Sequence, residues 1–307
     1  MPGTEPPCTV ALFGRRRPPE SRTGASDALP DSPFSDSPVP GPPADRAAAG
    51  AAERELRAAV AHVAEVFAGM AAHPDEKGCS YCWPEEEIAL LLDPDAALPD
   101  ELVGAVAREV GSHWDDHPAV VRRILPRLVV LMASGEANTV GMEAAQLARA
   151  GIPSWPREEA GAVRRFLDAW WTATLRHPDP PTPASDVFET CAMVSGTFTP
   201  WLDRWARERG PAADAHLGLA VDDWMDNLSS DSGVCSGFHV PWADGEEPVD
   251  ELRSWTVAHA PDRLRARGAD PVTVHRVELL ALPEEERWEE RHWPPHLWQA
   301  LLGARNS

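Results

Sequence analysis

Residues 53–70 read ERELRAAVAHVAEVFAGM, and their pattern is typical of most of the chain. The apolar side chains recur at steps of four, three, four and three, which places them along one face of a helix. They are Leu56, Val60, Val63, Phe67 and Met70. The same spacing returns further along, in Leu102, Val106, Val110 and Trp114. The sequence therefore predicts amphipathic helices packed through their apolar faces.

The residues at the boundaries of these segments also favour helices. Proline followed by acidic residues, as at 84–87, 156–159 and 200–203, is typical of a helix start, where the missing N–H costs nothing and the helix dipole favours negative charge. Gly151, Gly210 and Gly268 are the expected helix ends. Residues 272–277 are too short and too poorly bounded to predict a strand. We expect about ten to twelve helices in an all-α fold, as an irregular helical bundle or a short α-solenoid-like stack of antiparallel helices.

Composition divides the chain into four parts. Residues 1–45 hold 11 of the 32 prolines and predict a disordered arm. Residues 46–228 form the main helical domain, and 229–247, rich in Ser, Asp and Gly, form a loop. Residues 248–307 are expected to be a C-terminal helical segment packed on the main domain. The 13 tryptophans, against one tyrosine, predict a bulky core with polar contacts at its edge.

Charge and composition limit the partners. The formal net charge of −21 disfavours a surface that binds a phosphate backbone, so we expect no nucleic acid. No apolar run is long enough to span a membrane. The five cysteines are odd in number and thinly spread, as in proteins of a reducing compartment, which favours the cytoplasm.

Cysteine and histidine spacing marks the first candidate site. Cys79 and Cys82 form a C-x2-C pair, and His113 and His117 an H-x3-H pair. Two thiolates and two imidazoles complete a tetrahedral zinc site without an open position, so the metal would be structural. Because His117 precedes Pro118, we expect it outside a helix, with the two histidines across a helix–helix turn. The alternatives are a turn with both thiols packed under Trp83, and a redox pair in which a helix start lowers a cysteine pKa.

Asp222, Asp223 and Asp226 form a second candidate, a D-D-x-x-D pattern that resembles the Mg²⁺-diphosphate motif of class I terpene synthases. Its late position and the lack of a second metal motif favour the alternative of a solvated helix end. Arg127 follows Pro126, and we expect it to form a structural ion pair with Asp115 or Asp116 rather than to bind an anion.

A further pattern runs from 73 to 225. It comprises Cys79-x-x-Cys82, Trp114-Asp115-Asp116, Leu125-Pro126-Arg127 and Trp155-Pro156-Arg157-Glu158. This order resembles an uncharacterised bacterial family of all-helical proteins with C-x-x-C, Trp-Gly-Asp, Leu-Pro-Arg and Trp-Pro-x-Glu motifs. Here an aspartate replaces the family's glycine. The resemblance implies a helical fold and no particular activity.

The sequence contains no G-x-S-x-G, no H-E-x-x-H and no phosphate-binding glycine loop. We therefore expect a helical scaffold whose acidic body binds another protein, rather than an enzyme. The rival hypothesis is a metal-dependent enzyme that uses the Asp222 cluster or the Cys/His site.

Overall fold

The computed structural model describes residues 42–137, 142–229 and 247–304. These residues form thirteen α-helices and three short 3-10 helices, with no strand among them, which confirms the all-α prediction. The α-helices are α1 Pro43–Val66, α2 Glu85–Leu92, α3 Asp100–Arg108, α4 His117–Ser134, α5 Met142–Arg149, α6 Arg157–Arg176, α7 Ala184–Ser195, α8 Thr199–Arg207, α9 Pro211–Leu228, α10 Glu247–Ala266, α11 Pro271–Leu279, α12 Glu284–Arg287 and α13 Pro295–Ala304. The 3-10 helices are η1 Gly111–His113, η2 Ile152–Ser154 and η3 Glu290–His292.

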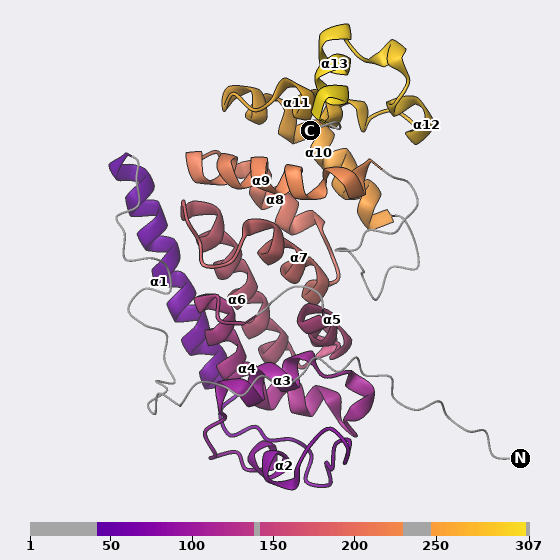
Figure 1. Ribbon diagram of the computed structural model, residues 1–307. Coiled ribbons are helices and arrows are strands. Elements are labelled where there is room, and N and C mark those ends of the chain that lie inside the picture. Colours follow the sequence, from indigo (N-terminus) through magenta and orange to yellow (C-terminus); the bar gives the residue numbers. More distant parts are fainter. Residues whose placement is uncertain (1–41, 138–141, 230–246, 305–307) are drawn as a thin grey trace, which may run out of the picture.

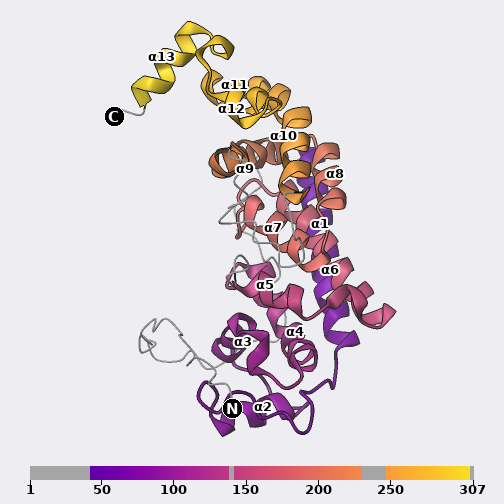
Figure 2. The ribbon, with the colours of Figure 1, turned by 90° about the vertical axis from the view of Figure 1, so that its right-hand side faces the viewer.

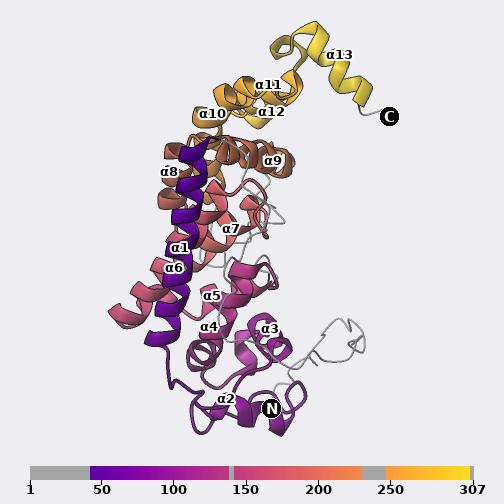
Figure 3. The same cartoon turned by 90° about the vertical axis from the view of Figure 1, so that its left-hand side faces the viewer.

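The helices stack along one elongated column (Figure 1). Helices α2 and α3 lie at one end, and α10 to α13 lie at the other. Helix α1 runs beside α6 in the opposite direction, as the view from its own side shows (Figure 3). Helix α13 projects away from the column (Figure 2). None of the described helices is both long and apolar enough to cross a membrane.

The apolar face of α1 is buried as its spacing predicts. Leu56, Val60 and Val63 lie inside the main core. The helix ends at Val66, whereas the apolar pattern continues to Met70. Phe67 is nevertheless buried and packs against Trp155 with ring centroids 6.0 Å apart. The period therefore predicts burial correctly beyond the point where the helix stops.

Tryptophan fills the centre of the column. Trp205 meets Trp171 and Trp224 edge to face, with ring centroids 5.1 and 5.6 Å apart. Its Nε1 donates to the backbone oxygen of Ala213 at 3.0 Å, while that of Trp171 donates to the backbone oxygen of Trp201 at 3.1 Å. Such edge-to-face pairs add stabilisation beyond the area they bury.

The C-terminal helices α10 and α11 join the same core, through Leu252, Trp255 and Val277. Arg263 of α10 is buried, and it donates to Asp214 and to two backbone oxygens of the neighbouring turn. A second, smaller cluster of Trp293, Leu279 and Leu301 lies where α11 meets the end of the chain. The segment predicted as an arm, up to residue 41, and residues 230–246 of the predicted loop lie outside the described residues.

One local prediction differs from the structure. Gly210 does not end a helix: with φ −73° it caps the start of α9, and α8 already ends at Arg207. Gly151 and Gly268 do have the positive φ of a residue that follows a helix. Helix α10 has 20 residues with Pro261 inside it, and residues 272–277 lie within α11.

Candidate metal centre

Three of the four predicted zinc ligands come together. The ligand atoms of Cys79, Cys82 and His113 all lie within 4.8 Å of one another. The Sγ of Cys82 and the Nδ1 of His113 are 3.5 Å apart. The two segments that meet here are separated by about 30 residues, so the fold, and not local sequence, creates the cluster.

The two cysteines lie on a tight turn before α2. The backbone oxygen of Cys79 accepts the N–H groups of Cys82 and Trp83 at 2.9 and 3.0 Å. The N–H groups of Tyr81 and Cys82 are directed at the Cys79 sulfur and lower the pKa of its thiol. Because the thiolate is the form that binds metal, this turn prepares Cys79 as a ligand.

Gly78 is required for this turn to pack. Its φ is +58°, a conformation that L residues with a Cβ rarely adopt. A Cβ here would lie 2.9 Å from Ile88 Cδ1 and 3.1 Å from the Trp114 ring. That ring packs against Trp83, with centroids 4.8 Å apart. The apolar floor of the cluster therefore comes from both of its segments.

Glu76 joins the cysteine turn to the segment that follows His113 through hydrogen bonds, so this contact needs no metal. Its side chain is buried, and its carboxylate accepts three backbone N–H groups. Oε1 accepts from Gly78 at 2.8 Å and from Asp115 at 3.0 Å, and Oε2 accepts from Asp116 at 2.8 Å. A carboxylate that accepts several N–H groups holds both backbones in place.

His113 ends η1, the short turn that follows α3. Its Nδ1 lies 2.9 Å from Oε1 of Glu109, the residue directly after α3. The same Oε1 accepts the N–H of Val110 at 2.9 Å. Gln146 of α5 accepts the N–H of Gly111 at 3.1 Å and so positions the start of η1. The imidazole is therefore oriented by a carboxylate before any metal is considered.

His117 is not part of the cluster, which corrects the predicted ligand set. It is the first residue of α4, with Pro118 in the first turn, where the missing N–H is tolerated. Its ring is buried beside Gly111, whose Cβ would lie 3.0 Å from the His117 Nδ1. Burial lowers the pKa of His117 and favours the neutral ring. The expectation that Pro118 keeps His117 out of a helix was wrong.

Arg127 does form a structural ion pair, but with another partner. It binds Asp100 at the start of α3 through Nε and Nη2, at 2.5 and 2.9 Å. Asp116 instead caps α4 by accepting the N–H of Ala119 at 3.0 Å. Asp115 accepts the N–H of Lys77 at 3.4 Å. Both aspartates therefore serve the turn next to the cluster.

The Asp222 cluster lies on α9, and the structure does not gather it into a metal site. Among the described residues, the only group of three or more potential ligands within 4.8 Å of one another is Cys79, Cys82 and His113. Asp226 pairs with Arg276 at 2.9 Å and is 95% exposed, and Asp223 accepts from Ser185 at 3.3 Å. Burial and then the neighbouring Asp223 raise the pKa of Asp222.

Sequence reasoning missed Glu76 and Glu109, the two carboxylates that organise the cluster. The chain has 49 acidic residues, and neither position carries a motif. One weak signal exists for Glu109, because it precedes His113 by four residues.

Three comparisons were made, with protein-family models, with curated proteins and with solved structures. None matches this chain. The resemblance to a family of helical bacterial proteins stays a prediction.

Proposed function

We propose that this chain binds one zinc ion through Cys79, Cys82 and His113, with Glu109 as the fourth ligand, and that the metal has a structural role in a helical scaffold. The observation that carries the proposal is the convergence of two thiols and one imidazole from distant segments. Such a donor set suits zinc.

The spacing of the ligand atoms supports tetrahedral zinc. Zinc bonds of about 2.3 Å to sulfur and about 2.0 Å to nitrogen, at the tetrahedral angle, place the two ligand atoms about 3.5 Å apart. The Sγ of Cys82 and the Nδ1 of His113 are separated by 3.5 Å. This pair is therefore spaced as two ligands of one tetrahedral zinc ion would be.

Glu109 is the carboxylate next to the cluster, and it would turn from His113 toward the two cysteines to become the fourth ligand. Its Oε1 is beside His113 Nδ1, the nitrogen that also faces Cys82. Metal binding removes the proton from that nitrogen, and the carboxylate would then face a lone pair. A cation bound by both groups removes this repulsion. Four protein ligands leave no position for water, which is the pattern of a structural site.

The metal would join the turn before α2 to the turn after α3 and would fix Tyr81 between its two cysteine ligands. Tyr81 is the chain's single tyrosine, and it is 84% exposed. An exposed aromatic side chain on a rigid turn is suited to contact with another protein. This supports the proposal that the chain acts by contact and that its partner is a protein.

Metal analysis of the purified protein tests the proposal. We expect one zinc per chain, lost in Cys79→Ser and in His113→Gln. Cys191→Ala and His117→Gln are the matched controls, because each removes the same kind of side chain outside the cluster, and both should retain one zinc. Zinc in none of the proteins, or retained in Cys79→Ser, would refute the site.

The fourth ligand has its own test. Glu109→Gln should keep zinc but bind it more weakly in a competition titration with a chromogenic chelator, because an amide is a poorer ligand than a carboxylate. Glu101→Gln, an exposed position on α3, is the control. Equal affinity of both variants would show that Glu109 is not a ligand.

The contact role is tested at Tyr81. A photo-crosslinking amino acid at position 81 should give a specific adduct in cells, and Cys79→Ser should abolish it. The same amino acid at Leu219, which is 66% exposed on α9, is the control. Adducts that are equal at both positions, or that persist in Cys79→Ser, would contradict a metal-held contact surface.

A further inference from the structure

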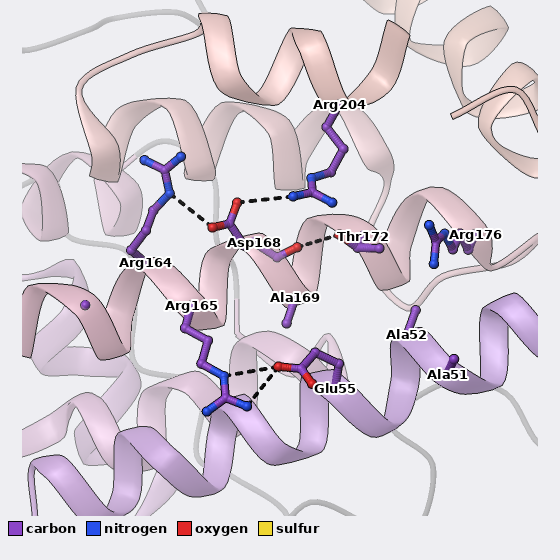
Figure 4. A pocket seen from close by; sticks show the side chains of 11 residues that line it. Ala51, Ala52, Glu55, Arg164, Arg165, Asp168, Ala169, Thr172, Arg176 and Arg204 are labelled. Atoms are coloured by element: carbon purple, nitrogen blue, oxygen red, sulfur yellow. Dashed lines mark hydrogen bonds and ion pairs between the residues drawn. The ribbon is translucent and has the colours of Figure 1, made fainter. Parts of the chain in front are cut away.

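A groove of about 570 Å³ lies between α1, α6 and α8 (Figure 4). None of its lining residues belongs to the segments that form the metal cluster. Small residues keep it open, namely Ala51, Ala52, Gly161 and Ala169. No atom lies within 4 Å of a Cβ built on Gly161, so that position faces empty space. The volume lies in the range of sites that hold a small molecule.

The groove is cationic, although the chain as a whole carries a net charge of −21. Four arginines line it, three from α6 and Arg204 from α8. The lining contains two carboxylates, those of Glu55 and Asp168. Asp168 serves two arginines, at 3.3 Å from Arg164 and 3.7 Å from Arg204. Arg176 is neutralised by Glu208, outside the lining. Positive charge is therefore in excess at Arg164 and Arg204.

The guanidinium of Arg164 is held in place and keeps donors free. It lies over the ring of the buried Trp201, 4.7 Å from its centroid, and its Nε donates to Asp168. Its two terminal nitrogens have no partner among the described residues. Stacking on an aromatic ring fixes the plane of an arginine while its outer N–H groups remain available to a ligand.

Arg204 and Arg165 add donors from the two sides. Arg204 contributes its terminal nitrogens, of which Nη2 lies 3.7 Å from Asp168, while its Nε is buried and out of reach of a ligand. Arg165 uses Nε and Nη2 to bind Glu55 of α1, at 3.1 and 2.9 Å, which leaves Nη1. Figure 4 shows Arg164 and Arg204 on either side of Asp168. Carboxylates thus orient the arginines and leave a set of unused N–H groups at the groove.

We propose that this groove binds the phosphate group of a small organic phosphate ester. A phosphate group offers several oxygens to the arginine N–H groups, and its negative charge meets the positive charge that Arg164 and Arg204 keep in excess of their one shared carboxylate. A nucleic-acid backbone is disfavoured, because the acidic body around the groove repels an extended polyanion. The small-residue floor leaves room for the organic part of the ester.

Calorimetric titration of the full chain tests this proposal, with phenyl phosphate and inorganic phosphate as probes and succinate as the comparison, at constant ionic strength. We expect saturable binding of phenyl phosphate at one per chain, with succinate weaker. Arg164→Gln and Arg204→Gln should each weaken it about tenfold, as expected for loss of a charge-assisted hydrogen bond. Arg291→Gln, at an exposed arginine on η3, should leave binding unchanged.

Two further variants distinguish a binding site from a structural charge network. Asp168→Asn should tighten binding of phenyl phosphate, because it removes the carboxylate that competes for both arginines. Gly161→Leu should abolish binding by filling the groove without a change in charge. Binding that does not saturate, that is equal in Arg164→Gln and Arg291→Gln, or that is tighter for succinate than for phenyl phosphate would overturn the proposal.

Discussion

Replacement of Glu76 by glutamine removes one negative charge and one acceptor at the point where the cysteine turn meets the histidine segment. The carboxylate accepts three N–H groups, two through Oε1 and one through Oε2. Glutamine keeps two of these bonds if its amide oxygen takes the place of Oε1. Its NH₂ group then faces the N–H of Asp116, and this partly buried donor has no acceptor.

An orphaned buried donor costs about 1–3 kcal/mol. For a domain of this size, 1 kcal/mol lowers the melting temperature by about 2–4 °C, so we expect Glu76→Gln to melt about 2–12 °C lower. The same contact positions His113 relative to the cysteines, so zinc affinity should also fall. The fall is about tenfold for each 1.4 kcal/mol by which the substitution destabilises the metal-bound form more than the metal-free form.

The assay is thermal unfolding with and without a chelator, together with zinc affinity from chelator competition. Glu101→Gln has the same change in charge at an exposed position and is the control. If Glu76→Gln melts with the control and binds zinc as tightly as the unmodified chain, then Glu76 does not fasten the two segments and the structural basis of the site is wrong.

Four further outcomes are expected from chemical and thermal unfolding. Gly78→Ala should destabilise by about 2–4 kcal/mol, because it combines a left-handed backbone with overpacking, and full stability would show that the turn can relax. Burial and the neighbouring Asp186 raise the pKa of Glu189 from 4.5 to about 7. Between pH 4.5 and about 7 the folded chain keeps a proton on Glu189 that the unfolded chain has lost, so the free energy of unfolding falls as the pH rises through this range. Glutamine carries no charge at any pH. Glu189→Gln should therefore be more stable than the unmodified chain by up to about 3 kcal/mol above pH 7, and equally stable near pH 4.5. A gain that does not depend on pH would contradict this. Arg263→Met should cost about 3–5 kcal/mol, because it leaves Asp214 unpaired, and a loss below 1 kcal/mol would show that α10 is held by apolar contacts alone. Trp205→Ala should cost about 3–5 kcal/mol, and a smaller loss would place the centre of the core elsewhere.

The helical fold could be predicted because its signals are local. The period of Leu56, Val60 and Val63 identifies the buried face of α1 without knowledge of what covers it. Pro84 and Pro156 directly precede α2 and α6. Proline is tolerated at a helix start because no N–H is needed there for a hydrogen bond within the helix. The order of stacking depends on contacts between distant buried residues, such as Phe67 with Trp155, and no local pattern contains that information.

The metal cluster was predicted only in part. Cys79, Cys82 and His113 are few enough in the sequence to be noticed as a set. His117 was included because it forms an H-x3-H pair with His113, and two imidazoles with two thiolates would complete a tetrahedral zinc site. Here α4 begins at His117, so His113 belongs to the preceding turn and the two rings are held by different contacts. Glu109 resembles every other acidic residue until the fold places it beside His113.

X-ray absorption at the zinc edge of the purified full chain identifies the atoms that surround the metal, and so tests whether Cys79, Cys82 and His113 bind zinc. We predict two sulfur neighbours at about 2.3 Å and two nitrogen or oxygen neighbours at about 2.0–2.2 Å, and no bound zinc in Cys82→Ser. A shell of light atoms alone, or a protein that contains no zinc after purification in zinc-supplemented medium, would contradict the account.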